Sequence, residues 1–499
     1  MAVVVVVGIV VVLGLIAVVA MRIRTRGRVP VDRKARLLGT GKALEPLTES
    51  GARQKAEDCG RRLGMDEPPG VVVGTAVAGR RRLYGSYEDL HVDIWGTRQG
   101  KTTCRTIPAI LAANGPVIAT SAKRDVVDAT RDVRAENRRR IWVFDPEAIA
   151  GEAPTWFWDP LAWVGGDEHR AALLAGHFAE AYPCADTEDH FEIGAEELLA
   201  LLFLAASVGE RRIAEVWGWV TYSQDTEPIE ILRAAHHSSA GSGLAAIYNS
   251  SVYEQTRVFN TAKQMVQCLR LPNVLDWITP SAERTRFDEH EFVERNDTLY
   301  ALSVGGPSSV APLVGALLEA VLTVAAAQDQ PTASPLLMVV DDAANLARWR
   351  DFPQRYGYYG SRGIVMMTML QSWSQGVRCW GADGMSELWS AATVRVLGSG
   401  VDDMPFLRDR AEVLGPGTLT AADLRSLPRG RAIVFPSGAP PVLIETQPWW
   451  NGPYAAEVER SLNRHDPRRR PLFDALIFSR SESSGTVTKI PAEETHPSA

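Results

Sequence analysis

Apolar and polar positions follow two different periods along most of the chain. In residues 71–160 and again in 278–448, short apolar runs of strand length are separated by segments with a helical period. Such alternation predicts a parallel β-sheet with helical crossovers. Residues 161–277 have a helical period throughout and contain no convincing strand. We therefore expect an α/β domain in two parts, 71–160 and 278–448, with an all-α domain inserted at 161–277.

The same pattern places the individual elements. Apolar runs predict strands within 71–74, 80–84, 90–94, 115–121, 140–146, 298–304, 336–340, 363–370, 393–397 and 432–435. Helical period predicts helices at 102–113, 168–181, 190–207, 211–221, 229–236, 240–248, 251–269 and 311–327. No fixed repeat recurs among the helices, which favours an inserted domain over a repeat array.

The N-terminus has a different pattern, an unbroken apolar run over residues 2–21 that is followed by four arginines. A bilayer core needs about 20 such residues, and the arginines place the C-terminal side in the cytoplasm. A cleaved signal peptide usually has a basic start and a shorter apolar stretch. We expect 1–21 to be an uncleaved transmembrane anchor of a single-pass protein of the cell membrane. Residues 22–70 would then form a juxtamembrane connector to a cytoplasmic body.

Composition narrows the class of protein further. Apolar and charged fractions of 45% and 23% are ordinary for a globular chain. A net charge of -7 argues against a generally basic nucleic-acid coat but leaves room for a local basic channel. The five cysteines form no C-x-x-C pair, which indicates neither a zinc site nor a disulfide framework. Residues 449–499 are polar and are predicted to form a largely disordered tail.

The strand predicted at 90–94 leads into a glycine-containing turn and then into the helix predicted at 102–113. This is the context of a phosphate-binding P-loop, and its backbone N–H groups would face the phosphates of ATP. Lys101 would reach the β- and γ-phosphates, and the Thr102 hydroxyl would ligate Mg²⁺. The full pattern requires glycine where this chain has Trp95, so a Gly-Lys-Thr helix start in an unrelated fold remains an alternative at this point. The predicted nucleotide-binding residues are Gly96, Thr97, Arg98, Gln99, Gly100, Lys101, Thr102 and Thr103.

Polar residues also end the apolar strands that follow. Asp341, directly after 336–340, is expected to hold Mg²⁺ beside Thr102. Asp342 is expected to orient or deprotonate the attacking water, and Gln371 to sense the γ-phosphate or to position that water. Each of these residues, taken alone, is also typical of a strand that ends in solvent.

A cation from a neighbouring subunit often stabilises the transition state in oligomeric ATPases. Arg362 is the catalytic candidate for that role, and Arg355 is a second one, although both also fit an ordinary surface position. Other conspicuous residues are assigned structural roles. Trp156, Phe157 and Trp158 are interpreted as a packing cluster, while Lys123 with Arg124, and the basic triplet 468–470, are interpreted as solvated segments.

In combination, these features resemble the type IV secretion coupling proteins of bacterial conjugation, the TraG/TraD-like ATPases, in an actinobacterial-looking subgroup. The resemblance spans roughly residues 70–450, with the motifs in the expected order. The segments that carry it are 96–103, 119–125, 143–146, 158–161, 259–263 (Phe-Asn-Thr-Ala-Lys), 340–345, 360–364 and 370–375.

The resemblance implies a RecA-like P-loop NTPase core with an inserted all-α domain and an N-terminal transmembrane helix, assembled as a homo-hexamer. It implies a motor that couples ATP hydrolysis to the transfer of DNA, or of relaxase–DNA, toward a type IV secretion channel, with single-stranded, relaxase-bound DNA as the expected form. The implied partners are DNA, relaxosome and secretion-channel proteins, and the membrane. In that family a P-loop lysine, an acid pair and a glutamine line the nucleotide site, and these positions match Lys101, Asp341 with Asp342, and Gln371.

Three features depart from the family pattern. Trp95 replaces the first P-loop glycine, Asp342 stands where the family usually has glutamate, and the anchor is one helix where many relatives have two. The first two leave open a nucleotide-binding receptor or scaffold for secretion substrates with little hydrolysis. A septal-type double-stranded DNA translocase is a further alternative, although its several membrane spans and DNA-reading C-terminal module are not evident here.

Overall fold

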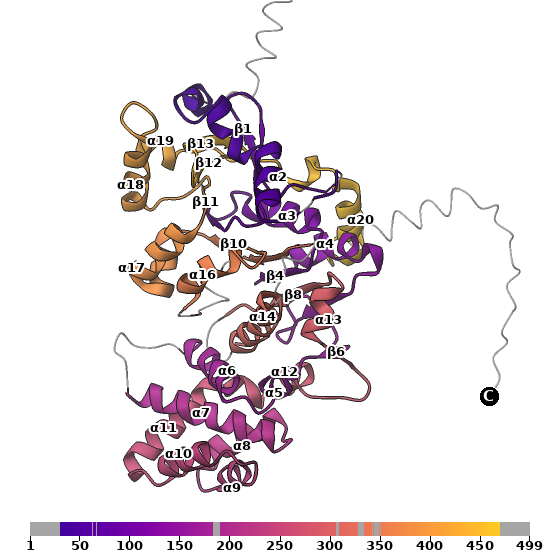
Figure 1. Cartoon of the computed structure of the whole chain (residues 1–499), viewed down its shortest axis with the longest axis vertical. Helices are drawn as coiled ribbons and strands as arrows, with labels where there is room; N and C mark the ends of the chain where they lie inside the picture. Colours follow the sequence, from indigo (N-terminus) through magenta and orange to yellow (C-terminus); the bar gives the residue numbers. More distant parts are fainter. Residues whose placement is uncertain are drawn as a thin grey trace, which may run out of the picture.

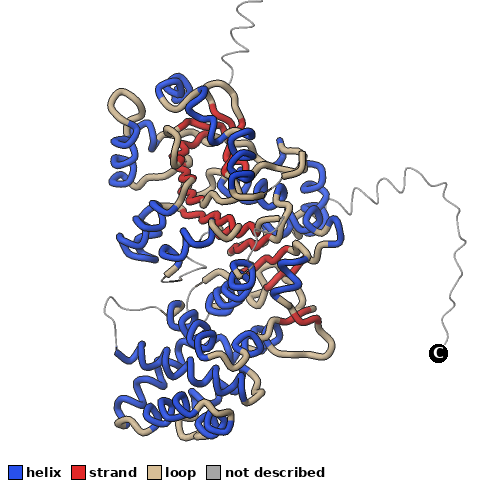
Figure 2. The backbone as a smooth tube through the Cα atoms, in the orientation of Figure 1, coloured by secondary structure: helices blue, strands red, loops and turns tan. Residues whose placement is uncertain are grey.

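The computed structural model describes residues 30–61, 63–65, 67–182, 190–305, 309–327, 334–341, 343, 349 and 351–469. Within these residues, one large sheet occupies one part of the molecule and a group of helices occupies the other (Figures 1 and 2). The sheet has eleven strands in the order β2-β1-β13-β12-β11-β3-β10-β9-β4-β8-β5. The predicted α/β class is therefore confirmed.

The central seven strands of the sheet are all parallel. Their residues are almost entirely buried, as expected of a sheet that helices cover on both faces. Because these strands run in one direction, their carboxyl ends meet at one edge. The strands are β3 (His91–Ile94), β4 (Val117–Ser121), β5 (Ile141–Phe144), β8 (Thr298–Leu302), β9 (Leu336–Val340), β10 (Ile364–Leu370) and β11 (Val394–Leu397).

An antiparallel extension continues the sheet beyond β11. It consists of β12 (Arg431–Pro436), β13 (Val442–Glu445), β1 (Val71–Ala76) and β2 (Arg82–Gly85). Segments that precede the P-loop and segments near the C-terminus thus pair side by side. The described part of the segment before β1 is more structured than its polar sequence indicates. It contains η1 (Pro30–Leu37), η2 (Gly41–Leu47) and α2 (Glu49–Asp58).

Helices follow most of the parallel strands along the chain. After the P-loop come η3 (Thr102–Thr106) and α3 (Ile107–Ala112), and after β4 comes α4 (Asp125–Arg134). Further along the chain are α13 (Glu289–Glu294), α14 (Ala311–Ala326), α16 (Phe352–Gly360), α17 (Trp373–Ala391), α18 (Met404–Leu414) and α19 (Ala421–Arg425). Helix α14 is buried over nearly its whole circumference. It contacts α13 and the inserted helices, and its apolar side chains share one core cluster with those of β8 and β9.

The inserted segment consists of helices, which Figure 1 shows gathered at the end of the molecule away from the antiparallel strands. Each predicted helix lies in its segment, with ends that differ by a few residues. Side chains cap several of them, as where Asp167 accepts from the backbone N–H of Arg170. The helices are α5 (Pro160–Val164), α6 (Glu168–Glu180), α7 (His190–Val208), α8 (Ile213–Thr221), α9 (Glu227–Ala234), α10 (Ser238–Tyr248), α11 (Val252–Met265), η5 (Gln267–Arg270) and α12 (Pro272–Ile278).

Aromatic packing joins the two parts of the molecule. Trp156 and Phe157 form the short strand β6 (Trp156–Phe157), which pairs with β7 (Thr285–Arg286). The Trp156 ring lies edge-on to Trp142 of β5 at 5.3 Å and to Trp277 of α12 at 5.6 Å. All three rings are buried. The interpretation of the Trp156 region as a packing cluster is therefore confirmed.

The prediction of a tail over 449–499 is wrong for residues 449–469. After η6 (Trp449–Asn451), helix α20 (Ala455–His465) packs against α4. Ser461 donates to the carbonyl of Asp128 at 2.6 Å, and Arg124 donates to the carbonyl of His465 at 2.9 Å. Few apolar residues make this contact, so hydropathy alone did not reveal it.

Two predictions concern segments beyond the described residues. Residues 1–29, with the predicted anchor at 1–21, lie outside them, as do 470–499. Among the residues that are described, no helix is both long and apolar enough to span a bilayer.

Candidate nucleotide-binding site

The predicted P-loop lies at the edge of the sheet where the parallel strands end. The backbone N–H of Trp95 donates to Leu370 of β10 at 3.0 Å, and that of Gly96 donates to Ser399 at 2.9 Å. The loop therefore leaves the sheet between the ends of β10 and β11. Gly100 adopts a left-handed φ of 97°, and its carbonyl accepts from the N–H of Cys104 at 2.8 Å, which starts the helix.

Trp95 occupies the position of the missing glycine because its side chain belongs to the core. The indole is fully buried in an apolar cluster of the antiparallel extension, which includes Val73 and Val434. Space for the ring comes from Gly398, where a Cβ atom would lie 2.0 Å from the indole. The close approach that requires glycine occurs one residue later, since a Cβ at Gly96 would lie 2.0 Å from the carbonyl oxygen of Gly400.

The key residues of the predicted site meet at the end of β9. The Lys101 ammonium lies 2.8 Å from Oδ1 of Asp341, and the Thr102 hydroxyl donates to Oδ2 at 3.2 Å. The side chains of Lys101 and Asp341 are 11% and 7% exposed, so this ion pair is largely removed from water. Residues distant in sequence thus place a cation, a hydroxyl and a carboxylate at the N-terminus of one helix.

The separation of the hydroxyl and the carboxylate fits a magnesium ion. Mg²⁺ binds oxygen ligands at about 2.1 Å in an octahedron, so adjacent ligands are roughly 3 Å apart. The 3.2 Å between Thr102 Oγ1 and Asp341 Oδ2 is close to that spacing. Burial and the nearby Asp341 carboxylate also raise the pKa of Asp125, at the start of α4. The carboxylates of Asp125 and Asp341 therefore lie close enough to repel each other, and a divalent cation at this edge would reduce that repulsion.

Gln371 is brought to the loop from the end of β10. The Thr97 hydroxyl donates to its side-chain oxygen at 3.3 Å, and its backbone N–H donates to Gln375 at 2.8 Å. Gln371 is thus next to the P-loop, as a residue that positions water requires. Asp342 lies outside the described residues, and its predicted role stays a prediction.

The two candidate arginines are in different situations. Arg355 is held within the chain by Glu319 and Asp351, each at 2.5 Å. Arg362 is exposed in the turn before β10, with its guanidinium 5.2 Å from the centre of the Tyr358 ring. It therefore lies at the opposite end of β10 from Gln371 and cannot serve the P-loop of its own chain. The role in a neighbouring subunit stays a prediction.

The remaining basic candidates are mostly paired. Arg124 binds Asp128 at 2.6 Å and is thereby fixed to α4. Arg468 pairs with Asp466 at 2.9 Å, and Arg469 pairs with Glu459 at 2.6 Å. Arg470 lies outside the described residues. Arg124 is thus a packing residue between α4 and α20 and not part of a solvated loop, whereas the Arg468 side chain is exposed, as a solvated segment requires.

A buried network beneath the P-loop was missed by sequence reasoning. Arg105, fully buried, donates to Asp93 of β3 at 2.7 Å and to the carbonyl of Val72, and contacts Nδ1 of His91 at 3.2 Å. Burial and the Arg105 charge lower the pKa of His91 to about 3, so the imidazole is neutral. The signal in the sequence was the pair of polar residues in the otherwise apolar run 90–94.

A second missed residue is Arg429, in the turn before β12. Its Nε lies 3.8 Å from where a Cβ of Gly100 would be, so a cation borders the phosphate loop on this side. Nothing in the local sequence indicated this proximity, which depends on how β12 pairs with β11.

Comparison with known proteins points to one family. Residues 335–432, which include Asp341 and Gln371, match a protein family described as the TraM recognition site of TraD and TraG. The bacterial conjugative coupling protein TrwBdeltaN70, in its unbound monoclinic form, has a TM-score of 0.58 at 14% identity. That alignment covers 80% of this chain and 91% of the other.

The chain resembles the type IV coupling proteins.

The prediction of that resemblance is confirmed, and the chain shares the α/β fold of the coupling protein TrwB. Two further structures of TrwB superpose with 16% identity over 72% of this chain and 86% of theirs. These are the complexes with the non-hydrolysable GTP analogue GDPNP and with ADP and Mg²⁺, and their TM-scores are 0.54 and 0.52. No curated protein sequence shows significant similarity to the chain.

Proposed function

We propose that this chain is a P-loop ATPase that couples ATP hydrolysis to the transfer of single-stranded, relaxase-bound DNA toward a type IV secretion channel. The observation that carries the proposal is the convergence of Lys101, Thr102 and Asp341 at the end of β9. Structures of the coupling protein TrwB with nucleotides support it, because they have the same fold.

The residues of the site have separate roles in this proposal. Successive N–H groups at the start of the P-loop helix bind the phosphates, and Lys101 moves from Asp341 to the β- and γ-phosphates. Thr102 and Asp341 are then available to hold Mg²⁺, which neutralises charge on the phosphates when it is bound. Gln371 orients the attacking water from the side of Thr97, and Asp342 is the proposed base.

The remaining parts of the proposal concern assembly. A ring of six copies would place Arg362 of one subunit at the nucleotide of the next, where a cation stabilises the charge of the transition state. Residues 1–21 would hold the ring in the cell membrane with the body in the cytoplasm. Relaxosome and channel proteins would be the partners, in keeping with the match to a TraM recognition segment.

Removal of the P-loop lysine tests the proposed function. Lys101→Ala is expected to abolish ATP turnover, because no other described side chain of the P-loop residues 96–103 brings an ammonium to Asp341. Lys42→Ala, which removes an exposed ammonium from η2, is the matched control and should leave turnover unchanged. Unchanged ATP turnover in Lys101→Ala would refute the proposal that the chain is a P-loop ATPase.

A second function is favoured by the match of residues 335–432 to a recognition segment. In this alternative, the chain is a nucleotide-binding receptor for secretion substrates and hydrolyses little ATP. Tight ATP binding, lost in Lys101→Ala, together with negligible hydrolysis in the presence of DNA, would favour the receptor over the motor.

A further inference from the structure

The first described element of the chain is the short 3-10 helix η1. It lies on the antiparallel extension of the sheet, where it contacts β13. Figure 1 shows this indigo N-terminal segment at the end of the molecule opposite the inserted helices. The part of the chain that follows the predicted membrane anchor is therefore built into the folded body.

The three-residue period of η1 gives it an inner and an outer edge. In a 3-10 helix, residues three apart lie one above the other. Ala35 is buried, and Leu38, three residues later, packs half-buried against the same core. Pro30, Arg33 and Arg36 form the outer edge, and all three are exposed. The packed helix thus presents two guanidinium groups to solvent.

Two ion pairs hold η1 in this orientation. Asp32 accepts hydrogen bonds from Arg431 of β12 at 2.8 and 2.9 Å, and both side chains are largely buried. Lys34 pairs with Asp423 of α19 at 2.7 Å. The two arginines of the outer edge, by contrast, form no hydrogen bond or ion pair with another described residue. Their positive charge is therefore available to a partner outside the described chain.

Charged and apolar neighbours add to the character of the outer edge. Glu445 of β13 contacts both Arg431 and Arg80 of the β1–β2 turn, so this carboxylate is already paired with other cations. Leu37 follows Arg36 and is 56% exposed. An exposed apolar side chain next to unpaired cations is the composition of a segment that lies at a membrane interface.

The chain between the predicted anchor and η1 limits how far the outer edge can lie from a bilayer. The anchor is predicted to end at residue 21, and η1 starts at Pro30. Nine residues span at most about 32 Å even when they are fully extended. The sequence 22–28 also adds four arginines to the three cations of η1. Clusters of about four to eight basic residues on the cytoplasmic side of a membrane helix are typical of binding to anionic lipids.

We propose that the outer edge of η1 binds the phosphate-bearing headgroups of anionic lipids in the cytoplasmic leaflet. Arg33 and Arg36 contact headgroup phosphates, and Leu37 enters the boundary between headgroups and acyl chains. Because η1 is fixed to the sheet, this contact turns the antiparallel extension toward the bilayer and the inserted helices away from it (Figure 1). The inference rests on the membrane anchor of the proposed function, and it adds a lipid site on the folded body.

Lipid uses the whole outer edge, whereas a nucleic acid uses only part of it. DNA phosphates would attract the same two arginines but would leave Leu37 in water. The headgroup layer accommodates both the guanidinium groups and the apolar side chain. It is also the anionic surface that the predicted anchor holds within about 32 Å of η1. Anionic lipid is therefore the favoured occupant.

Hydrogen exchange of η1 in lipid nanodiscs tests the proposal. The full-length chain is placed in discs of neutral phosphatidylcholine, or of the same lipid with about 30% phosphatidylglycerol. Amides of η1 should exchange at least about threefold more slowly in the anionic discs at about 0.1 M salt. The difference should disappear at about 1 M salt, where charges are screened within about 3 Å.

The variant Arg33→Gln/Arg36→Gln removes both contacts with headgroup phosphates. One basic residue near an anionic membrane surface strengthens binding about fivefold, so the docking equilibrium should fall about 25-fold. That loss abolishes the lipid-dependent protection of η1. The variant Arg33→Lys/Arg36→Lys keeps the charge and should retain most of the protection, and Leu37→Ser should weaken it at every salt concentration.

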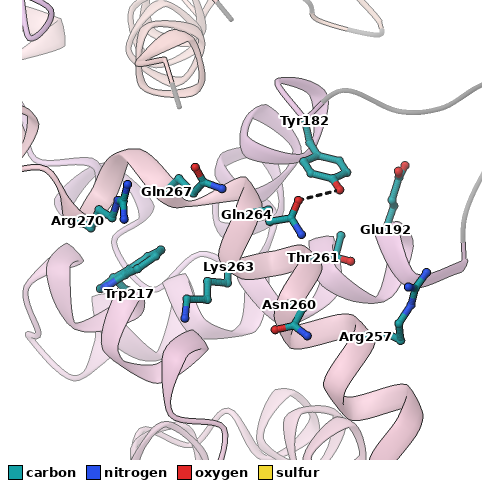
Figure 3. Close-up of a pocket in the computed structure, with 10 residues that line it drawn as sticks. All are labelled: Tyr182, Glu192, Trp217, Arg257, Asn260, Thr261, Lys263, Gln264, Gln267 and Arg270. Atoms are coloured by element: carbon teal, nitrogen blue, oxygen red, sulfur yellow. Dashed lines mark hydrogen bonds between the residues drawn. The ribbon is translucent and has the colours of Figure 1, made fainter. Parts of the chain in front are cut away.

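The matched control is Arg257→Gln/Arg270→Gln, which removes two exposed arginines from the inserted domain. Figure 3 shows that both side chains line a polar cleft among the inserted helices, and the volume of this cleft is about 680 Å³. The control should keep the full difference between anionic and neutral discs.

Three results would overturn the proposal. The first is equal exchange of η1 in neutral and anionic discs, and the second is an equal loss of protection in the η1 and control variants. The third is equal slowing of η1 exchange by an oligonucleotide added to neutral discs, which would assign the outer edge to nucleic acid.

Retention in the discs and ATP hydrolysis, measured on the same samples, separate this proposal from the proposed function. A chain that enters the discs and hydrolyses ATP without lipid-dependent protection would refute only the lipid site. Protection without hydrolysis would refute only the ATPase, and a chain that does not enter the discs would refute the anchor and the lipid site together. Hydrolysis equal to wild type in neutral discs also establishes that the η1 variants are folded.

Discussion

Replacement of Arg105 is expected to loosen the P-loop without touching a phosphate-binding group. Arg105 lies on the helix that follows the loop and forms an ion pair with Asp93 of the preceding strand, with both side chains fully buried. It also binds the Val72 carbonyl and His91. The pair therefore joins the helix of the P-loop to the strand that leads into it.

The expected magnitude follows from what Arg105→Met leaves behind. Methionine keeps the unbranched first part of the arginine side chain and fills part of its space, but the Asp93 carboxylate loses its cation in a fully buried site. Removal of one partner from a buried ion pair costs about 3–5 kcal/mol. In Arg105→Met/Asp93→Leu neither charge remains, and most of that loss should be recovered.

Hydrogen exchange is the suitable assay, because global unfolding of a chain of this size is not a two-state process. Amides of β3 and α3 should exchange about two to four orders of magnitude faster in Arg105→Met, which is the effect of 3–5 kcal/mol on local opening. Amides of α8 and α10 should be unaffected. An increase of the exchange rate in Arg105→Met below about tenfold would refute the reasoning. The same holds if exchange in Arg105→Met/Asp93→Leu is as fast as in Arg105→Met.

Three further predictions follow from the same structure. Trp95→Gly, which restores the usual P-loop glycine, should speed hydrogen exchange of β3 amides by at least about two orders of magnitude, the effect of about 3 kcal/mol on local opening, because it empties a buried site opposite Gly398. Wild-type exchange rates would contradict this. Gln371→Ala should lower kcat for ATP hydrolysis more than tenfold and change KM by less than about threefold, because the uncharged Gln371 side chain lies beside the P-loop, where it can position water but contributes no charge to phosphate binding. A change in KM alone would contradict this. Burial and the Arg355 cation lower the pKa of His177 from its ordinary 6.5 to about 3, with Glu319 also facing the ring. Below pH 6.5 the unfolded chain therefore protonates His177 while the native state does not, so the contribution of this group to stability is complete above pH 6.5 and is lost as the pH falls toward 3. The urea midpoint of His177→Gln, measured from pH 7 to 4, should depend less on pH than that of the wild type. An unchanged dependence would contradict the assignment.

Much of the fold was predictable because buried parallel strands have continuous apolar sequences. The runs at 336–340 and 363–370 are β9 and β10 within one residue of their ends. Helix α20 was not predictable, because only a few of its side chains are buried and hydrogen bonds to α4 supply the rest of the contact. Strand β13 was also missed, since a four-residue strand has little periodicity to detect.

The site was predictable to the extent that it lies at strand ends. Lys101, Thr102 and Asp341 meet because carboxyl ends of parallel strands share an edge of the sheet. The reason for Trp95 could not be read from the sequence, since it depends on Gly398, about three hundred residues away. The same holds for Arg429, which β12 brings to Gly100.

The most direct test of the central claim is the rate of ATP hydrolysis by the full-length chain, alone and with single- or double-stranded DNA. The proposed motor predicts Mg²⁺-dependent hydrolysis that single-stranded DNA stimulates more than double-stranded DNA, and that Lys101→Ala eliminates. Tight ATP binding with no hydrolysis under any of these conditions would contradict it.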